Sequence, residues 1–264
     1  MQERRKKMAI ELPEEYNAPY ECIVVLGRGI EKVQQKGSYV WKPTSLIERT
    51  DKRGAHTGYR LNNSIDTISM IGGSNANVIA AYHLFKSLSA SEKPPETIMF
   101  AAGRPQYLEK ESFDVCEGVV LAKKFITKLT GKNYPVNFND VDDYKVADIG
   151  LVKIILEWQN KNTFSDIKRS LEIASSSGME NIAFITIGVH LPRSAIMLYK
   201  IIENNPHLCR TLPRFLSADK ILSAGNPRYE RIFAALHHSA EFERNAAREL
   251  LGLMRFLTGD YKDK

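Results

Sequence analysis

The residues best suited to chemistry lie near position 190, where His190 and Arg193 flank Pro192. Proline suits the first turn of a helix, so the spacing predicts that His190 lies at or just before a helix N-terminus. The unpaired N–H groups and positive dipole end there attract an anion and oppose protonation of imidazole. Helical side chains lean toward the N-terminus, so the Arg193 guanidinium can reach the same spot. We expect a neutral His190 and an anion clamp that is open to solvent.

Polar residues follow three other short apolar runs in the same manner. In an open parallel sheet, ligands bind outside the carboxyl ends of the strands, where loops and helix N-termini converge. If these runs are strands, the residues just after them are candidates for ligand contacts. The candidates are Gly27, Arg28 and Gly29; Gly103 and Arg104; and Glu157, Asn162 and Thr163.

Each candidate also has a purely structural interpretation, which the sequence leaves open. A histidine after a strand can be a cap, arginines there can be solvated turn residues or surface ion-pair partners, and glycines can serve backbone geometry. Asn162 and Thr163 can cap a helix with or without contacting a ligand. The turn Gly27-Arg-Gly29 is followed by Lys32 where a dinucleotide fingerprint has its third glycine, so a standard Rossmann dinucleotide site is not expected.

Other patterns argue against a metal site and against several familiar catalytic motifs. His237 and His238 are adjacent, so on a helix they point to different faces. Asp140, Asp142 and Asp143 lack the glycine and distal glutamate of a calcium loop. The sequence contains no GxSxG, P-loop or HExxH pattern. We therefore expect no bound metal.

The elements that must position the candidates alternate along the chain. Continuous apolar runs predict buried strands, and the segments between them carry apolar residues at helical spacing. This alternation predicts a doubly wound, mostly parallel α/β sheet with helices on both faces. The expected strands are 22–26, 96–102, 152–156 and 182–187. The expected helix starts are a cap at Ser74 or Asn75, a cap at Ser112 or Asp114, a capping box of Thr163 with Asp166, and Pro192.

The chain is interpreted as one main domain with additions. Residues 1–19 form an N-terminal lead, and residues 20–204 form the α/β domain. The polar stretch 31–69 shows no sustained periodicity and is interpreted as a long insertion, a kind of loop that is often functional or mobile. Residues 205–264 are interpreted as a helical segment packed on the same domain, with one long or two broken amphipathic helices over 229–257.

The composition is that of a globular protein: 264 residues, of which 43% are hydrophobic and 26% charged. It excludes collagen, disordered and disulfide-rich classes, and no apolar run approaches the roughly 20 residues that span a bilayer. The N-terminus lacks the apolar region of a signal peptide, and Cys22, Cys116 and Cys209 are far apart, so a reducing cytoplasm is expected. The net charge of +6 is spread along the chain, so nucleic acid is not an expected partner.

Four motifs occur in order along the chain. They are Ile23-Val-Val-Leu-Gly27, Glu117 opening a helix, Glu157 followed by Asn162-Thr163, and Ile185-Thr186-x-x-x-His190-x-x-Arg193. Together they resemble the YdcF-like (also SanA/ElyC-like) family of domains of unknown function, over about Glu21 to Lys200. The sequence departs from the family pattern at Val115-Cys-Glu117-Gly, at Asn162-Thr-Phe-Ser-Asp166 and at Ala102-Gly103-Arg104.

The resemblance implies a Rossmann-like α/β fold and adds Glu117 and Thr186 to the expected site. It also implies a nucleotide-like ligand. For envelope-associated members, the family implies an N-terminal membrane anchor and a role in cell-envelope or lipid-carrier metabolism. This sequence shows no such anchor, so it resembles the soluble branch.

We therefore expect a protein that binds a phosphorylated or nucleotide-like small molecule, with a nucleotide or S-adenosylmethionine as candidate cofactors. If it is an enzyme, the expected class is a phosphate-ester or pyrophosphate hydrolase or a transferase. The alternative is a non-catalytic ligand sensor or protein-interaction module, in which 31–69 and the C-terminal helices contact a partner. The expected roles are anion binding for Arg28, Arg104 and Arg193, ligand orientation for Asn162 and Thr163, and acid/base chemistry for Glu117 or Glu157 with His190.

Overall fold

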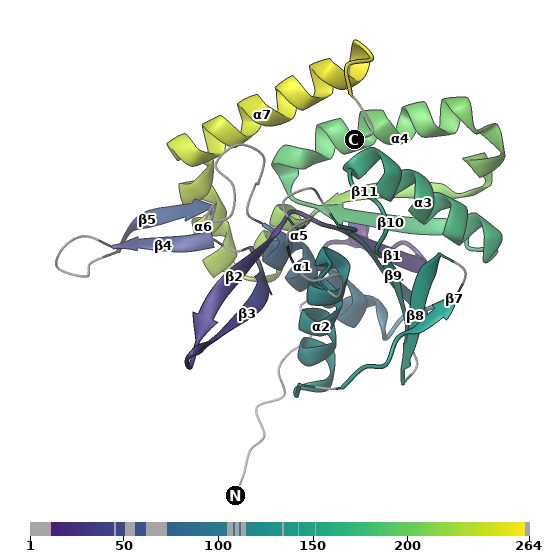
Figure 1. Ribbon diagram of the computed structural model, residues 1–264, viewed down its shortest axis with the longest axis horizontal. Helices are drawn as coiled ribbons and strands as arrows, with labels where there is room; N and C mark the ends of the chain where they lie inside the picture. Colours follow the sequence, from purple (N-terminus) through teal and green to yellow (C-terminus); the bar gives the residue numbers. More distant parts are fainter. Residues whose placement is uncertain are drawn as a thin grey trace, which may run out of the picture.

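The protein is an α/β structure built on a seven-stranded, mostly parallel sheet (Figure 1). The computed structural model describes residues 12–44, 46–50, 56–61, 73–104, 108, 111, 115–133, 135–141, 143–150 and 152–261. The strand order is β11-β10-β1-β6-β9-β8-β7, in which the first five strands are parallel and the last two antiparallel. The strands are β1 (Cys22–Leu26), β6 (Thr97–Ala101), β7 (Asn139–Val141), β8 (Tyr144–Ile149), β9 (Val152–Glu157), β10 (Asn181–Thr186) and β11 (Leu212–Ser217).

Helices cover both faces of the sheet. Alternate residues of β1 face opposite ways: Ile23 and Val25 pack in one core with α1, α2, α5 and α6, while Val24 and Leu26 pack in the other with α3 and α4. All five residues of β1 are buried, as expected for a central parallel strand. The helices are α1 (Ser74–Leu88), α2 (Glu117–Thr130), α3 (Thr163–Ser176), α4 (Leu191–Asn204), α5 (Ala218–Gly225), α6 (Pro227–His237) and α7 (Ala240–Leu257), with 3-10 turns η1 (Glu14–Tyr16), η3 (Gly188–His190) and η4 (Pro206–Arg210).

The four expected strands are confirmed as β1, β6, β9 and β10, whereas β7, β8 and β11 were not predicted. Continuous apolar runs identify strands that are buried on both sides, but edge strands lack such runs. Leu212 and Arg214 of β11 are exposed, and Pro213 interrupts the apolar pattern. The C-terminal segment is therefore not purely helical, because it also supplies β11 to the sheet. Its last part forms two helices, α6 and α7, which is one of the two predicted arrangements.

The prediction of a long irregular insertion over 31–69 is wrong for its described part. Two antiparallel hairpins lie there, β2 (Ile30–Gln35) with β3 (Ser38–Pro43) and β4 (Leu46–Thr50) with β5 (His56–Leu61). The first hairpin turns at Lys36 and Gly37, which have φ values of 49° and 83°. Most of its side chains are exposed or half-buried, so its alternation of polar and apolar residues is weak. Residues 45, 51–55 and 62–69 lie outside the described residues.

Several helix caps differ from those expected. Gly73, with φ 134°, caps α1 in place of Ser74 or Asn75, because the Ser74 hydroxyl bonds elsewhere. Cys116 caps α2, and the predicted Ser112 and Asp114 lie outside the described residues. Asn162 caps α3, accepting from the Ser165 N–H at 3.0 Å. Among the helices of the described ranges, none combines the length and apolar character that a membrane span needs.

Candidate functional site

Three of the predicted residues converge on one carboxylate at the carboxyl ends of β1 and β10. Arg28 follows β1, His190 ends the turn after β10, and Arg193 lies in the first turn of α4. Arg28 Nη2 donates to Glu249 Oε1 at 2.7 Å, and His190 Nδ1 lies 2.8 Å from Glu249 Oε2. Arg193 Nε forms an ion pair with the same Oε2 at 2.8 Å. The four side chains form what we call the Glu249 cluster.

The expectation that this clamp is open to solvent is wrong. His190 is completely buried, and the exposed fractions of Arg28 and Glu249 are 8% and 6%. The cover is α7, which carries Glu249 and lies against α4, α6 and η3; Figure 1 shows it running across the top of the molecule. Gly252, one turn after Glu249, allows the close approach, because a Cβ there would lie 2.5 Å from Arg193 Nη1.

Glu249 was not singled out in the sequence, although a signal for it exists. In α7, Phe242, Leu253 and Phe256 are half-buried and Leu250 and Met254 are exposed, so the inward face can be read from the helical spacing. Asn245 and Glu249 fall on the inward face and are buried. A polar side chain at an inward position of an amphipathic helix indicates a buried polar partner, but not which one.

The electrostatics of the cluster fix its protonation. Burial and the Arg28 cation lower the pKa of His190 to about 3, so the ring is neutral as expected, although burial rather than the helix terminus is the main cause. Burial alone would raise the pKa of Glu249, but Arg28, His190 and Arg193 hold that pKa well below its usual range. The carboxylate is therefore ionised and opposes the charge of the two arginines.

This protonation also fixes the tautomer of His190. An ionised Glu249 can only accept, so His190 Nδ1 carries the proton and donates to it. Nε2 then carries the lone pair and lies 3.5 Å from the Thr163 hydroxyl, at the start of α3. An imidazole held by a carboxylate on one side and facing a hydroxyl on the other can accept and return a proton.

Glu117 fixes the backbone of the turn that carries Arg28. Its Oε1 accepts from the Gly29 N–H at 2.5 Å and from the Ser74 hydroxyl at 2.9 Å. Ser74 in turn accepts from the Arg28 N–H at 2.6 Å, which ties the turn after β1 to α1 and α2. Burial raises the pKa of Glu117, and these hydrogen bonds oppose the shift. Glycine is needed at position 27, because a Cβ there would lie 2.6 Å from Glu117 Oε1.

Glu157 belongs to a second buried pair of carboxyl groups. It ends β9, and its Oε1 accepts from the N–H groups of Gln159 and Asn160 at 3.0 and 3.2 Å. The carboxyl group of Asp166 in α3 is close enough to act on its ionisation. Burial, followed by the neighbouring charge of Glu157, raises the pKa of Asp166 well above its usual value. Two neighbouring buried carboxyl groups disfavour being ionised together, so the pair holds one proton.

The shared proton predicts a pH dependence of stability. Because the folded-state pKa of Asp166 is raised, the folded protein holds a proton that the unfolded chain releases above about pH 4. The free energy of unfolding should therefore fall as the pH rises from there through the folded-state pKa. Asp166→Asn keeps a hydrogen-bond donor toward Glu157 without a titrating proton, so it should flatten this slope in urea unfolding measured from pH 4 to 9. An unchanged slope in the variant would show that the pair shares no proton.

The remaining predicted residues either lie apart from the Glu249 cluster or have a structural role in a turn, a close backbone approach or a helix cap. Arg104 turns into its own loop, where Nη2 donates to the carbonyls of Leu108 and Glu111 at 3.0 and 2.6 Å. Gly103 is required by a close approach, because a Cβ there would lie 1.9 Å from the Asn160 carbonyl oxygen. Gly29 has φ 98°, and Asn162 caps α3.

Several buried polar atoms near the strand ends lack a hydrogen-bond partner within the described ranges. They include Thr186 Oγ1, at the end of β10, and Asn77 Oδ1, whose amide nitrogen donates to Leu26 O at 2.8 Å. Both amide atoms of Asn245 are also unpaired, one turn before Glu249 on α7. Buried polar groups in native proteins nearly always have a partner, so such atoms indicate bound water or ligand.

The described residues contain no group of three or more His, Cys, Asp or Glu side chains arranged to hold a metal ion. His237 lies 3.5 Å from Asp219 Oδ2 through Nε2, and this contact raises its pKa. Comparison of the chain with family models, curated proteins and solved structures finds no match in any of the three.

Proposed function

We propose that this protein binds a phosphorylated or nucleotide-like small molecule at the carboxyl ends of β1 and β10, as a member of the YdcF-like family. The observation that supports this most is the convergence of Arg28, His190 and Arg193 on the Glu249 carboxylate. Two hydrogen-bond partners and a third residue paired by charge, from three separate elements, surround one anionic group. The anionic group of the ligand takes the place of Glu249 when α7 moves away.

Charge balance supports the need for an anion at this place. Arg28 is almost fully buried, and the Arg193 side chain is 16% exposed. A buried cation without a counter-charge costs several kcal/mol, so release of Glu249 has to be coupled to binding of another anion. A phosphate group can supply that charge and accept hydrogen bonds from all three residues.

The strand order supports a ligand site at the same point. From β1 the chain continues to β6 on one side, while β10 and β11 lie on the other. We propose that the parallel strands form a Rossmann-like, doubly wound sheet, in which ligands bind where the strand order reverses, between β1 and β10. The buried unpaired atoms of Thr186, Asn77 and Asn245 add hydrogen-bonding groups for the neutral part of the ligand.

If the protein is an enzyme, we propose a phosphate-ester or pyrophosphate hydrolase or a transferase. His190 Nε2, which carries the lone pair beside Thr163, would accept the proton of the attacking water or acceptor hydroxyl and return it to the leaving-group oxygen of the bound ligand. The ligand anion that replaces Glu249 would accept from the Nδ1–H. From the family resemblance we further propose a cytoplasmic protein linked to cell-envelope or lipid-carrier metabolism, with a nucleotide or S-adenosylmethionine as candidate cofactors.

The test is a thermal-shift and calorimetry screen with ATP, S-adenosylmethionine, a sugar phosphate and inorganic phosphate. A ligand present at one hundred times its Kd should stabilise the protein by about 2.7 kcal/mol. Glu249→Gln should bind that ligand more tightly than the wild type, because the competing carboxylate charge is gone, and Arg193→Gln should bind it more weakly. His190→Ala should abolish turnover and leave binding largely intact. Absence of stabilisation by all four compounds in both wild type and Glu249→Gln would refute the proposal.

The alternative is a non-catalytic ligand sensor or protein-interaction module. One observation favours it: the outer face of α7 carries exposed apolar side chains, which are unusual on a surface without a partner. They are Leu250, Leu251, Met254 and Leu257, with exposed fractions of 59%, 49%, 56% and 58%. For a pure interaction module, none of the four compounds should stabilise the protein, so the same screen separates the two functions.

A further inference from the structure

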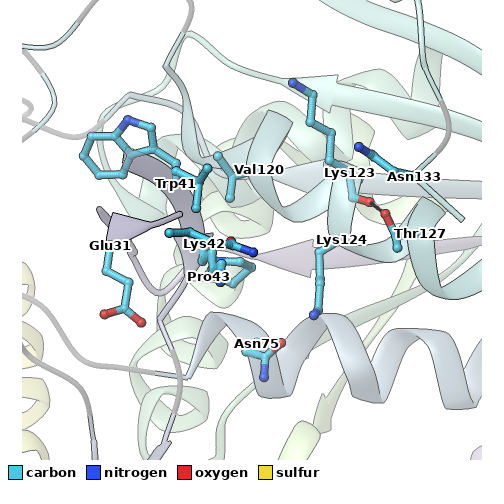
Figure 2. Close-up of a pocket in the computed structure, with 12 residues that line it drawn as sticks. Glu31, Trp41, Lys42, Pro43, Asn75, Val120, Lys123, Lys124, Thr127 and Asn133 are labelled. Carbon is cyan, nitrogen blue, oxygen red and sulfur yellow. Dashed lines mark hydrogen bonds between the residues drawn. The ribbon is translucent and has the colours of Figure 1, made fainter. Parts of the chain in front are cut away.

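A separate cleft of about 600 Å³ lies between the β2–β3 hairpin and α2. Figure 2 shows Trp41 and Glu31 on one side of it and Lys123, Thr127 and Asn133 on the other. Its volume is within the range of small-molecule sites in proteins. It is lined by Glu31, Gln35, Val40, Trp41, Lys42, Pro43, Asn75, Val120, Lys123, Lys124, Thr127 and Asn133.

A hydrogen bond at the turn after β1 joins the two walls of the cleft, β2 and α2. β2 begins directly after Gly29, whose N–H donates to Glu117 in the first turn of α2. The end of the hairpin is tied to α1, because the Asn75 N–H donates to the Thr44 carbonyl at 3.0 Å. From this fixed end, α2 presents Val120, Lys123, Lys124 and Thr127 to β3, at the three- and four-residue spacing of one helix face.

The cleft gathers more positive than negative charge, with three lysines and one carboxylate in its lining. Lys42, Lys123 and Lys124 are exposed, and their ammonium groups form no hydrogen bond or ion pair with the residues that the structure describes. Other lysines are paired, as Lys32 is with Glu111 and Lys200 with Glu203. Three like charges around one hollow repel each other and raise the local concentration of anions.

The rest of the lining fits an organic rather than a purely inorganic anion. Val40, Pro43 and Val120 give the cleft an apolar surface, and half-buried Trp41 adds a flat aromatic ring. The side-chain amides of Asn75 and Asn133 can hydrogen-bond a neutral polar group. Glu31 is the one carboxylate of the lining, and it is buried and already engaged in an interaction.

We propose that this cleft is a second binding site, for an organic phosphate that carries at least two negative charges. Its phosphate groups lie among Lys42, Lys123 and Lys124, and its non-polar part packs against Trp41 and Pro43. The Glu249 cluster contributes no side chain to this site, so the inference is independent of the proposed function. Lysine suits this role because its ammonium group acts as a flexible point charge toward phosphate.

The experiment uses ADP and inorganic pyrophosphate as probes. The chain has two tryptophans, so Trp158→Phe leaves Trp41 as the one fluorescent reporter. We expect saturable quenching by ADP and weaker binding of pyrophosphate, which has no part to pack on the ring. Adding Lys123→Gln and Lys124→Gln should weaken ADP binding about tenfold or more, since glutamine keeps the helix and removes the charge.

A control variant makes the result specific. Lys86→Gln with Lys93→Gln removes the same charge from exposed positions outside the cleft and should leave the affinity unchanged. Because Trp41 alone reports the binding, a ligand held at the strand ends does not contribute to the quenching. Equal loss of affinity in the cleft and control pairs, or no quenching by either probe, would overturn the inference. Tighter lysine-dependent binding of a thymidine oligonucleotide than of ADP would replace it with a nucleic-acid site.

Discussion

Glu249→Ala is expected to lower the free energy of unfolding by about 3–5 kcal/mol. The substitution removes the counter-charge of buried Arg28 and of Arg193, and leaves His190 Nδ1 without its acceptor. Removing one partner of a buried ionic network costs far more than the network itself contributes, because the other charges stay buried. Urea unfolding followed by circular dichroism measures the change.

A matched substitution on the same helix gives the baseline. Glu243 is exposed, so Glu243→Ala should change the free energy of unfolding by no more than about 0.5 kcal/mol. Inorganic phosphate or acetate should raise the melting temperature of Glu249→Ala more than that of the wild type, because either anion can fill the vacated place. If Glu249→Ala costs as little as Glu243→Ala, the arginines do not depend on this carboxylate.

Gly103→Ala is expected to cost about 3 kcal/mol, at the upper end for overpacking. The added Cβ would lie 1.9 Å from the carbonyl oxygen of Asn160 and 2.7 Å from its nitrogen. The two segments cannot separate easily, since the Arg104 N–H donates to that same oxygen at 2.9 Å. Thermal and urea unfolding of the variant measure the cost.

Comparison with Gly131→Ala separates the cost of the steric clash at position 103 from the cost of backbone strain alone. Gly131 has φ 74° and open space around its Cβ position, so alanine there should cost only about 1 kcal/mol from the left-handed conformation. A Gly103→Ala variant no less stable than Gly131→Ala would mean that the turn after β6 adapts. Gly103 was predicted as a ligand contact, but the approach of Asn160 accounts for the glycine without a ligand.

The centre of the fold could be predicted because its strands are buried on both faces. β1, β6, β9 and β10 each read as a continuous apolar run, and their neighbours in the sheet follow from the alternation with helices. The β2–β3 hairpin could not be predicted in this way. Its side chains are mostly exposed, so register and turn geometry define it rather than hydrophobic periodicity.

The site was predictable in part for a similar reason. Arg28 and His190 each follow a central strand, and β1 and β10 are neighbours, so the two side chains had to meet. Glu249 could not be assigned, because no local pattern links α7 to residues 59 and 221 positions earlier. Arg104 also follows a strand, but its guanidinium donates to the carbonyls of Leu108 and Glu111 in the loop instead of joining the site. The direction of those two carbonyl groups depends on the backbone conformation of the loop, which the residue types do not reveal.

The long separation along the chain between Glu249 and its partners has a consequence for synthesis on the ribosome. Arg28 emerges 221 residues before its partner and His190 emerges 59 residues before it. Because a lone guanidinium avoids burial, the nascent chain has to keep this corner hydrated while the strands around it pair. The Glu249 cluster therefore forms only after α7 has emerged, and a ribosome stalled before α7 should hold a partly formed, protease-sensitive intermediate.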